Sequence, residues 1–174
     1  MIKFMQTERL ILRRFTTDDA EEYFPLVSDP DILRYAGGLP LKTVDETRQM
    51  LLERPIRDYE SRGYGRMACI EKSSGRLIGF SGLKYLDGLQ EVDVGYRFLK
   101  DCWGKGYATE SARLLMQEGI REHGFKRIIG LAERENVAST NVLKKLGLIF
   151  ECTIMLDDHP NELELYAIAT GDFA

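Results

Sequence analysis

The chain has little cysteine and little histidine. Cys69, Cys102 and Cys152 are the three cysteines of 174 residues, and no two of them have Cys-x-x-Cys spacing. We therefore expect neither a disulfide framework nor a structural zinc site, but three buried thiols in a reducing cytoplasm. The two histidines, His123 and His159, form no ligand spacing. A histidine-based metal site and a Ser-His triad are excluded on that ground.

Long apolar runs and a positive charge excess are also missing. No apolar run is long enough to cross a bilayer, and the first residues lack the apolar centre and cleavage site of a signal peptide. The net charge of −4 argues against a general nucleic-acid binder, because phosphate affinity comes from accumulated Lys and Arg. There is no repeat and no linker rich in Pro, Gly or Ser. With 44% hydrophobic residues, we expect one domain over residues 1–174.

Hydrophobic periodicity and turn signals predict the elements of this domain. Strands are expected at residues 9–15, 66–72, 76–86, 91–98, 127–133, 148–156 and 162–168. Helices are expected after the caps at Thr16 and Thr43, with a kink at Pro55, and over residues 105–122 and 135–145. This order predicts an α+β fold, with a mixed, mostly antiparallel sheet of about seven strands and helices on both faces.

The stretch from Glu91 to Ala112 contains a strand, a glycine turn and the start of a long helix. Gly104 and Gly106 free the backbone just before that helix. A helix start approached through glycines leaves N–H groups unpaired, and these are suited to binding an anion such as phosphate. The pattern of this turn alone leaves open a purely structural role in tight packing.

Two common phosphate-binding loops do not fit this turn. A Walker A loop ends in Gly-Lys-Ser/Thr, whereas Tyr107 follows Gly106. A dinucleotide fingerprint needs a third Gly or Ala where Thr109 stands, and a parallel strand–helix–strand unit near the N-terminus. A diphosphate site in an antiparallel setting is the phosphate reading that remains.

Three segments in order widen the pattern beyond the turn. They are Asp93–Tyr96, Trp103–Glu110 and Glu135–Gly147, and their spacing resembles that of the GNAT superfamily of N-acetyltransferases. Residues 7–13 resemble the opening of its ribosomal-protein N-terminal (alanine/serine) acetyltransferase branch. The resemblance spans nearly the whole chain. It implies a GNAT-type domain that binds acetyl-coenzyme A as co-substrate, without a metal, and moves the acetyl group to an amine.

The resemblance also implies where the coenzyme binds. Its diphosphate would contact the backbone of Gly104, Lys105, Gly106, Tyr107, Ala108 and Thr109, with Lys105 adding charge. A bulge at Gly95 would splay its strand from the strand after the long helix. The pantetheine arm would then pair with Tyr96, Arg97, Phe98 and Leu99, and the side chains of Asn136, Ser139 and Asn141 would contact it. Two alternatives stay open: Gly95 as a small residue beneath a neighbour, and Asn136 and Ser139 as helix caps.

The catalytic candidates lie on the same strand and on the helix after it. Asp93, and behind it Glu91, share a strand face with Gly95, so either could take the amine proton directly or through water. Both could also be solvated carboxylates on a sheet face. Leu143 stands where many members of the superfamily have a tyrosine acid, which leaves Ser139 or a water to protonate the thiolate.

We expect direct attack of the amine on the thioester in a ternary complex. Backbone N–H groups at a Gly95 bulge would polarise the thioester carbonyl. No neighbouring base supports Cys102 as a nucleophile.

A protein N-terminal α-amine is the favoured acceptor. Near pH 7.4, roughly 20–30% of an α-amine is neutral, against roughly 0.1% of a lysine amine. The alternatives are a polyamine, an amino acid or an aminoglycoside as acceptor, or a catalytically silent acyl-coenzyme A-binding module. The wall that selects the acceptor is expected around residues 35–42, the second helix and residues 157–161. We expect no nucleic-acid or membrane partner, and a monomer or homodimer.

Overall fold

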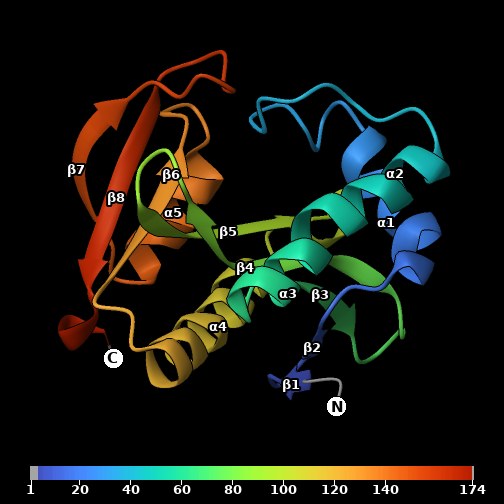
Figure 1. Cartoon of the computed structure of the whole chain (residues 1–174), viewed down its shortest axis with the longest axis horizontal. Coiled ribbons are helices and arrows are strands. Elements are labelled where there is room, and N and C mark those ends of the chain that lie inside the picture. The colour runs from blue at the N-terminus through green and yellow to red at the C-terminus, as the bar shows by residue number, and fades with distance from the viewer. Residues whose placement is uncertain (1–3, 174) are drawn as a thin grey trace.

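The computed structural model describes residues 4–173. Its strands are β1 (Phe4–Gln6), β2 (Leu10–Arg13), β3 (Arg66–Glu71), β4 (Leu77–Leu86), β5 (Glu91–Phe98), β6 (Arg127–Ala132), β7 (Ile149–Ile154) and β8 (Leu163–Ala169). Within the described residues these eight strands form one sheet in the order β1-β2-β3-β4-β5-β6-β8-β7 (Figure 1). Neighbours are antiparallel except β5 and β6, which run parallel. The predicted mixed α+β sheet is confirmed.

The helices follow the predicted caps and breaks. They are α1 (Ala20–Ser28), α2 (Val44–Leu51), α3 (Arg57–Arg62), α4 (Tyr107–His123) and α5 (Val137–Lys145). At the start of α2 the Thr43 hydroxyl accepts a hydrogen bond from the Glu46 N–H at 3.1 Å, and the Glu46 carboxylate accepts one from the Thr43 N–H. Pro55 lies in a π-helical turn between α2 and α3, which is how the chain accommodates the predicted break.

The strand that the sequence pattern does not predict is β1. It has three residues and pairs antiparallel with β2, with Met5 opposite Leu12. A segment this short is too brief for the two-residue period of a strand to be recognised. Its pairing partner, rather than its own sequence, makes it a strand.

Helices pack on both faces of the sheet. On one face Val94 of β5 lies in a buried cluster with Ala112 and Met116 of α4. On the other face Phe80 of β4 contacts Tyr23 of α1, with ring centroids 6.4 Å apart. Because successive strand residues point to opposite faces, α1 and α4 lie on opposite sides of the sheet. None of the helices within residues 4–173 is long and apolar enough to cross a membrane.

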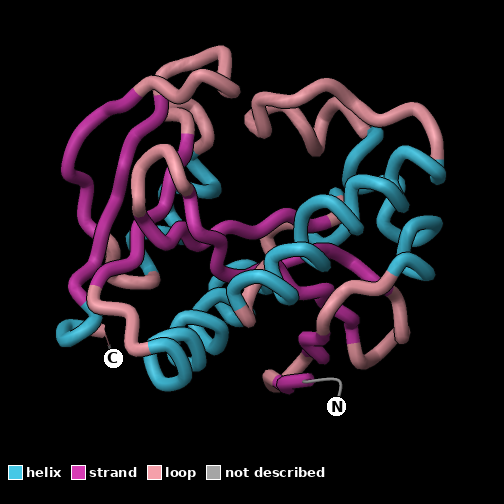
Figure 2. The backbone as a smooth tube through the Cα atoms, viewed as in Figure 1, coloured by secondary structure: helices cyan, strands magenta, loops and turns pink. Residues whose placement is uncertain are grey.

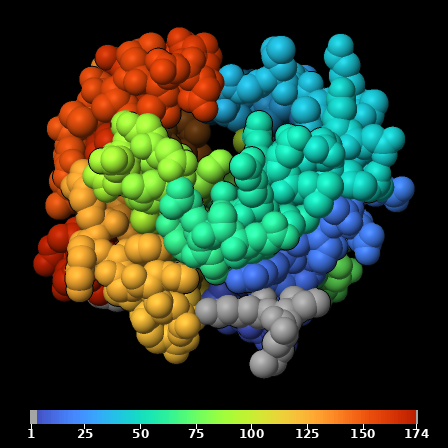
Figure 3. Space-filling view, in the orientation of Figure 1, coloured from blue at the N-terminus to red at the C-terminus, as the bar shows by residue number. Residues whose placement is uncertain are grey.

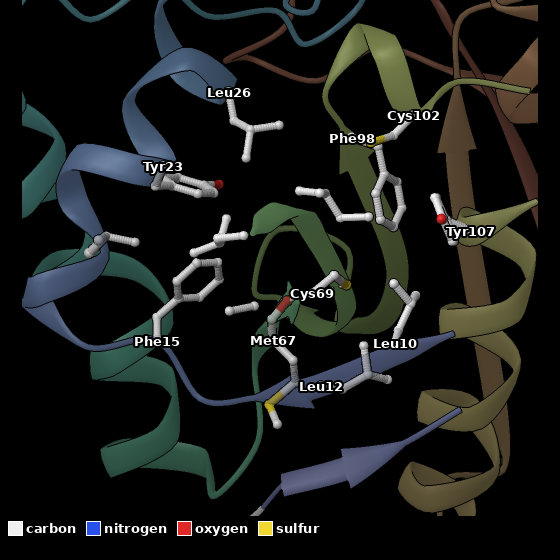
Figure 4. Close-up of a cluster of buried hydrophobic side chains, with 14 of the residues drawn as sticks. Leu10, Leu12, Phe15, Tyr23, Leu26, Met67, Cys69, Phe98, Cys102 and Tyr107 are labelled. Carbon is white, nitrogen blue, oxygen red and sulfur yellow. Dashed lines mark hydrogen bonds between the residues drawn. The ribbon is translucent and has the colours of Figure 1, made fainter. Parts of the chain in front are cut away.

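One buried cluster connects the N-terminal strands to the glycine turn (Figure 4). Its labelled members are Leu10, Leu12, Phe15, Tyr23, Leu26, Met67, Cys69, Phe98, Cys102 and Tyr107. The rings of Phe98 and Tyr107 lie 6.1 Å apart, on either side of that turn. The turn is therefore anchored to the core at both ends.

The fate of the three cysteines differs from the prediction. Cys69 and Cys102 are buried, as expected, but Cys152 is exposed. Cys152 lies on β7, the edge strand, where no residue is fully buried. The expectation of a buried thiol at this position is wrong, because its strand has a neighbour on one side only.

Candidate active site

An opening between β5 and β6 is the central feature of the site. β5 pairs with β4 at every position from Glu91 to Phe98, whereas the pairing recorded between β5 and β6 among the described residues is Asp93 with Ile129. At their amino ends the two parallel strands are joined by Arg127 Nε, which donates to Glu91 at 2.8 Å, whereas beyond Asp93, towards their carboxyl ends, the described residues of the two strands are not paired with each other. Figure 2 shows β5 between two halves of the molecule, β1–β4 with α1–α3 and β6–β8 with α5. The predicted splay is confirmed.

The hydrogen-bond pattern of β5 shows which backbone groups face the opening. The Leu99 N–H donates to the Ile78 carbonyl at 2.9 Å. Because antiparallel pairs alternate along a strand, the backbones of Gly95, Arg97 and Leu99 face β4, and those of Tyr96 and Phe98 face β6. The expected pairing with an extended ligand therefore narrows to Tyr96 and Phe98.

The Trp103 indole forms a hydrogen bond with one of the backbone groups of β5 that face the opening. Its Nε1–H donates to the Phe98 carbonyl at 2.8 Å, although about half of the Trp103 side chain stays exposed. The groups of β5 that still face the opening include the N–H and C=O of Tyr96 and the N–H of Phe98.

No bulge occurs at Gly95. The register of β4 and β5 runs without a shift through the pair Gly82–Gly95. A Cβ atom at position 95 would overlap the guanidinium of Arg66. The alternative reading, a small residue beneath a neighbouring side chain, is the one the structure shows, and the bulge prediction is wrong.

Arg66 reaches Asp93 by crossing two glycines. Arg66 pairs with Gly82, and Gly82 pairs with Gly95, so the three form a row across β3, β4 and β5. The guanidinium donates to the Gly82 carbonyl and to Asp93 Oδ2, the latter at 2.7 Å. Sequence reasoning missed Arg66, since no motif links positions 27 residues apart.

Asp93 lies where the two strands part. It is only 7% exposed, and its carboxylate accepts a hydrogen bond from the Arg66 side chain on β3 at 2.7 Å. Burial raises the pKa of the Asp93 carboxyl, and the charge and hydrogen bond of Arg66 only partly offset that effect. Asp93 is therefore not a solvated surface carboxylate. It is a buried group at the point where the strands part.

Glu91 lies at the closed end of the strand pair. Its carboxylate accepts from Arg127 Nε at 2.8 Å, and the same guanidinium binds both oxygens of Glu151 on β7. Glu91 precedes the Asp93–Ile129 pair, whereas the strands separate after it. The structure does not bring Glu91 to the opening.

The glycine turn leads into α4 as predicted. Gly104 and Gly106 have φ values of +74° and +83°, a left-handed region in which side chains are strained. Gly106 is the N-cap and has no side chain to cap the first-turn N–H groups of this 17-residue helix. Lys105 between them is exposed. These features fit an anion site, because unpaired N–H groups and the helix dipole point the same way.

The first turn of α4 is held by the N-terminal segment. Glu110 accepts hydrogen bonds from the Thr7 hydroxyl at 2.5 Å, the Arg9 N–H at 2.9 Å and Arg9 Nε at 2.7 Å. The Arg9 guanidinium also lies 4.4 Å from the centre of the Tyr107 ring, and Tyr107 donates to Glu71 at 2.6 Å. Two residues of the Thr7–Arg13 motif, Thr7 and Arg9, therefore form a clamp on the turn.

The start of α5 faces the opening from the other side. The Asn136 side chain accepts from the Ser139 N–H at 3.3 Å and caps the helix. The Tyr96 hydroxyl lies 2.9 Å from the Ser139 carbonyl oxygen and 3.1 Å from Ser139 Oγ. Asn141 is exposed, and it stands two positions beyond Ser139, which puts it on another side of the helix. The structure joins Asn136, Ser139 and Tyr96 and leaves Asn141 apart.

Leu143 explains why no tyrosine stands in this helix. It is 1% exposed and packs directly over Gly130 of β6, where a Cβ atom would overlap it. The position faces the core. The phenol that lies beside Ser139 comes from Tyr96 on β5 and not from a tyrosine in α5. The sequence motifs did not identify Tyr96 as a neighbour of Ser139.

Two loops meet beside the end of β6. His159 Nε2 lies 3.2 Å from the Tyr35 carbonyl oxygen and 3.5 Å from Glu133, which also accepts from the Asn161 side chain at 3.2 Å. His159 Nδ1 lies 3.2 Å from the Asn161 carbonyl oxygen and accepts from the Asn161 N–H at 3.3 Å, so both ring nitrogens contact the two loops. Figure 3 shows a hollow below the meeting of these red and blue segments. Two predicted parts of the acceptor wall therefore touch.

Cys102 is unsuited to nucleophilic attack. It is buried, and burial together with the neighbouring Asp101 raises the pKa of its thiol to about 11. The thiolate is the nucleophilic form of cysteine, so this residue is unreactive at neutral pH.

Sequence comparisons place the chain among acetyltransferases. The family model for the acetyltransferase (GNAT) domain matches residues 9–149. The uncharacterized N-acetyltransferase p20 of Bacillus licheniformis is 32% identical over 147 residues, which cover 82% of this chain and 80% of that protein. The uncharacterized protein YkkB of Bacillus subtilis is 31% identical over 153 residues, 85% and 86% of the two chains.

Solved structures share the fold over nearly the full length. A GNAT-family acetyltransferase from Bacillus anthracis superposes with a TM-score of 0.81 at 26% identity, covering 98% of this chain and 100% of that one. RimL, a ribosomal alpha-N-protein acetyltransferase in complex with coenzyme A, gives a TM-score of 0.80 at 18% identity, covering 96% and 98%. The second likeness concerns the fold alone.

Proposed function

The chain belongs to the GNAT family of acetyl-coenzyme A-dependent N-acetyltransferases, and from this premise we propose that it acetylates the α-amine of a protein N-terminus. The observation that carries the proposal is the opening between β5 and β6, into which the backbone groups of Tyr96 and Phe98 turn beside the uncapped start of α4. One end of this path offers N–H groups to a diphosphate. The other end offers a strand edge to an extended amide chain.

The residues present fit acetyl-coenzyme A. The first-turn N–H groups of α4, with Lys105, would hold the diphosphate. The free groups of Tyr96 and Phe98 would pair with the amides of the pantetheine arm, as a further strand pairs with a sheet edge. Asn136 would contact the same arm. Acetyl-coenzyme A supplies a thioester, whose carbonyl carbon accepts a nucleophile and whose sulfur leaves.

The protein residues then have three tasks. The Tyr96 N–H, rather than that of Gly95, faces the opening and would donate to the thioester oxygen as negative charge develops there. Asp93, at the parting of the strands, would take the proton of the attacking amine directly or through water. Ser139 would donate its hydroxyl proton to the departing sulfur. Attack would occur directly, without an acyl-enzyme, because Cys102, the thiol near the turn, is buried and its pKa is raised to about 11.

Among the possible acceptors, an α-amine requires the least help from a catalytic base in this site. Its neutral fraction near pH 7.4 is roughly 20–30%, so it needs no strong base before attack. The fold likeness to the RimL structure, whose name records an alpha-N-protein acetyltransferase, and the clamp formed by Thr7 and Arg9 both accord with this choice. The loops that meet at His159 and Tyr35 would form the wall that the N-terminal residues of the acceptor contact. We place the reaction in the cytoplasm.

Release of free thiol from acetyl-coenzyme A tests the proposal. The enzyme is incubated with peptides that begin with alanine or serine, the same peptides with a blocked N-terminus, and small amines: a polyamine, an amino acid and an aminoglycoside. We expect turnover with the free N-terminal peptides and none with the blocked ones. Turnover confined to a small amine would overturn the N-terminal assignment and leave the acetyltransferase assignment in place.

A further inference from the structure

Two hydroxyl groups meet across the opening between β5 and β6. Tyr96 comes from β5 and Ser139 from α5, and their oxygens lie 3.1 Å apart. The Tyr96 ring packs against both buried clusters, and the Asn136 cap fixes the Ser139 backbone. Both partners are therefore held in place by contacts outside the pair.

The positions of the protons follow from what each atom can do. The Ser139 carbonyl oxygen can only accept, so the Tyr96 hydroxyl at 2.9 Å donates to it. The Tyr96 oxygen is then an acceptor, and Ser139 Oγ donates its proton to it. In the absence of substrate, the proton that Ser139 would give to sulfur is directed at Tyr96.

Burial also keeps the Tyr96 phenol protonated at neutral pH. Burial raises the pKa of this phenol, although the Ser139 hydrogen bond opposes that effect. A phenol that does not ionise is a permanent donor, which can turn its proton from the Ser139 carbonyl to Ser139 Oγ by a rotation about one bond.

We propose that Tyr96 is a positioning residue for Ser139 in thiol release, and this inference rests on the proposed function. The Tyr96 hydroxyl fixes Ser139 Oγ beside the opening. When Ser139 gives up its proton, Tyr96 donates to Ser139 Oγ and stabilises the charge that develops there. Tyr96 and Ser139 together would take the place of the single tyrosine acid that many superfamily members have at the position of Leu143.

The step balances without any further reactant. The amine nitrogen forms a bond to the carbonyl carbon, and the carbon–sulfur bond breaks with its electron pair on sulfur. The Ser139 proton moves to sulfur and yields the free thiol. The proton lost by the amine, taken up by Asp93 or water, returns through water to Ser139. The sum is amine plus thioester giving amide plus thiol.

A double-mutant cycle on kcat tests the inference. Tyr96→Phe keeps the ring and removes the hydroxyl, and Ser139→Ala removes the other hydroxyl. We expect kcat to fall about 10-fold in the first and about 100-fold in the second, with KM for acetyl-coenzyme A within about 2-fold. The double variant should be no slower than Ser139→Ala, because Tyr96 acts through Ser139.

Tyr166→Phe is the matched control. Tyr166 is buried on β8, a strand that does not border the opening, and donates its hydroxyl to Glu164 at 2.8 Å. It should lower stability about as much as Tyr96→Phe while kcat stays at the wild-type value. Urea unfolding of all variants separates a loss of folded protein from a loss of rate.

The outcomes distinguish this inference from the function on which it rests. Wild-type turnover with an unchanged Tyr96→Phe rate, or with effects that multiply in the double variant, would overturn the positioning role alone. If the folded wild-type protein binds acetyl-coenzyme A and releases no thiol with any amine, both the inference and the proposed function are overturned.

Discussion

Two arginine–carboxylate pairs hold the two ends of the candidate site, and they differ in what they do to the carboxylate. At the diphosphate end, Glu110 is partly exposed and receives donors from Thr7 and from the backbone and side chain of Arg9. At the reacting end, Asp93 is buried and accepts a hydrogen bond from the Arg66 side chain. Glu110 receives several hydrogen bonds, whereas Asp93 is distinguished by its burial away from water.

The pKa values of the two carboxyl groups move in opposite directions. Burial raises the pKa of Glu110, but the hydrogen bonds from Thr7 and Arg9 outweigh it and the pKa is lowered. Burial of Asp93 outweighs its partners and the pKa is raised. A carboxylate with a lowered pKa is a permanent anion that holds structure. A carboxyl group with a raised pKa binds a proton more readily, which a catalytic base requires.

The largest expected effect comes from removing the partner of the buried carboxylate. Arg66→Ala leaves Asp93 buried with an uncompensated charge, and we expect it to lower the free energy of unfolding by about 3–5 kcal/mol. Urea unfolding at neutral pH measures this loss. Arg9→Ala at the more exposed pair is the control, expected to cost about 1 kcal/mol. Equal costs at the two ends would contradict the distinction between them.

Filling the space beneath Arg66 is expected to have the next largest effect. Gly95→Ala places a methyl group against the guanidinium and should cost about 1–3 kcal/mol. Gly38→Ala is the matched control, because a Cβ there meets no atom within 4 Å. In an Arg66→Ala background the Gly95→Ala cost should shrink, since the clash is gone. A cost that stays the same in both backgrounds would show that the guanidinium is not what requires glycine.

A smaller loss is expected at the diphosphate end. Glu110→Gln keeps the shape of the side chain but removes its charge, and it should lower stability by about 1–2 kcal/mol because charged acceptors make stronger hydrogen bonds. Affinity for coenzyme A, measured by calorimetry, should fall as the first turn of α4 loosens. Glu118→Gln, on the same helix but remote from the turn, serves as control. If Glu110→Gln bound coenzyme A with unchanged affinity, the contacts of Thr7 and Arg9 with Glu110 would not be needed for the anion site.

The smallest effect, and the one that shows the contrast most clearly, is the dependence of stability on pH. The lowered pKa of Glu110 gives stability that is present above about pH 4.3, the unfolded value, and is lost as pH falls through the folded pKa. The raised pKa of Asp93 has the opposite sign. Its contribution is present below about pH 3.9 and is lost as pH rises through the folded pKa. Unfolding curves of Glu110→Gln and Asp93→Asn, each compared with wild type from pH 3 to 7, should therefore diverge with opposite slopes.

Local patterns predicted most of the fold. The two-residue period of β5 and the glycines before α4 depend on near neighbours in the sequence, and both agree with the structure. The three-residue β1 and the exposed Cys152 on β7 depend on which strand ends the sheet. Strand order at the edges is set by pairing across the whole sheet, so short segments there carry too little signal.

The residues of the candidate site likewise fall into those that a local pattern predicts and those that depend on partners far away in the sequence. The diphosphate turn lies within one motif, and the sequence predicted that Gly104 and Gly106 free its backbone; both have φ values in the left-handed region. The Arg66–Asp93 pair and the Tyr96–Ser139 pair join residues 27 and 43 positions apart, so no spacing reveals them. Gly95 was recognised as special, but its reason, the guanidinium above it, requires the neighbouring strand. Glu91 shares a face with Asp93 and still lies at the closed end.

The reacting end is tested most directly by the pH dependence of kcat/KM in Asp93→Asn and wild type, with an N-terminal peptide as acceptor. If Asp93 takes the amine proton, the wild-type profile has an acidic limb above the ordinary carboxyl range, because burial raises the pKa of Asp93. Asp93→Asn should lose that limb and lower kcat about 100-fold or more while remaining folded. An unchanged rate and an unchanged profile in the folded variant would contradict the assignment of Asp93 as the base.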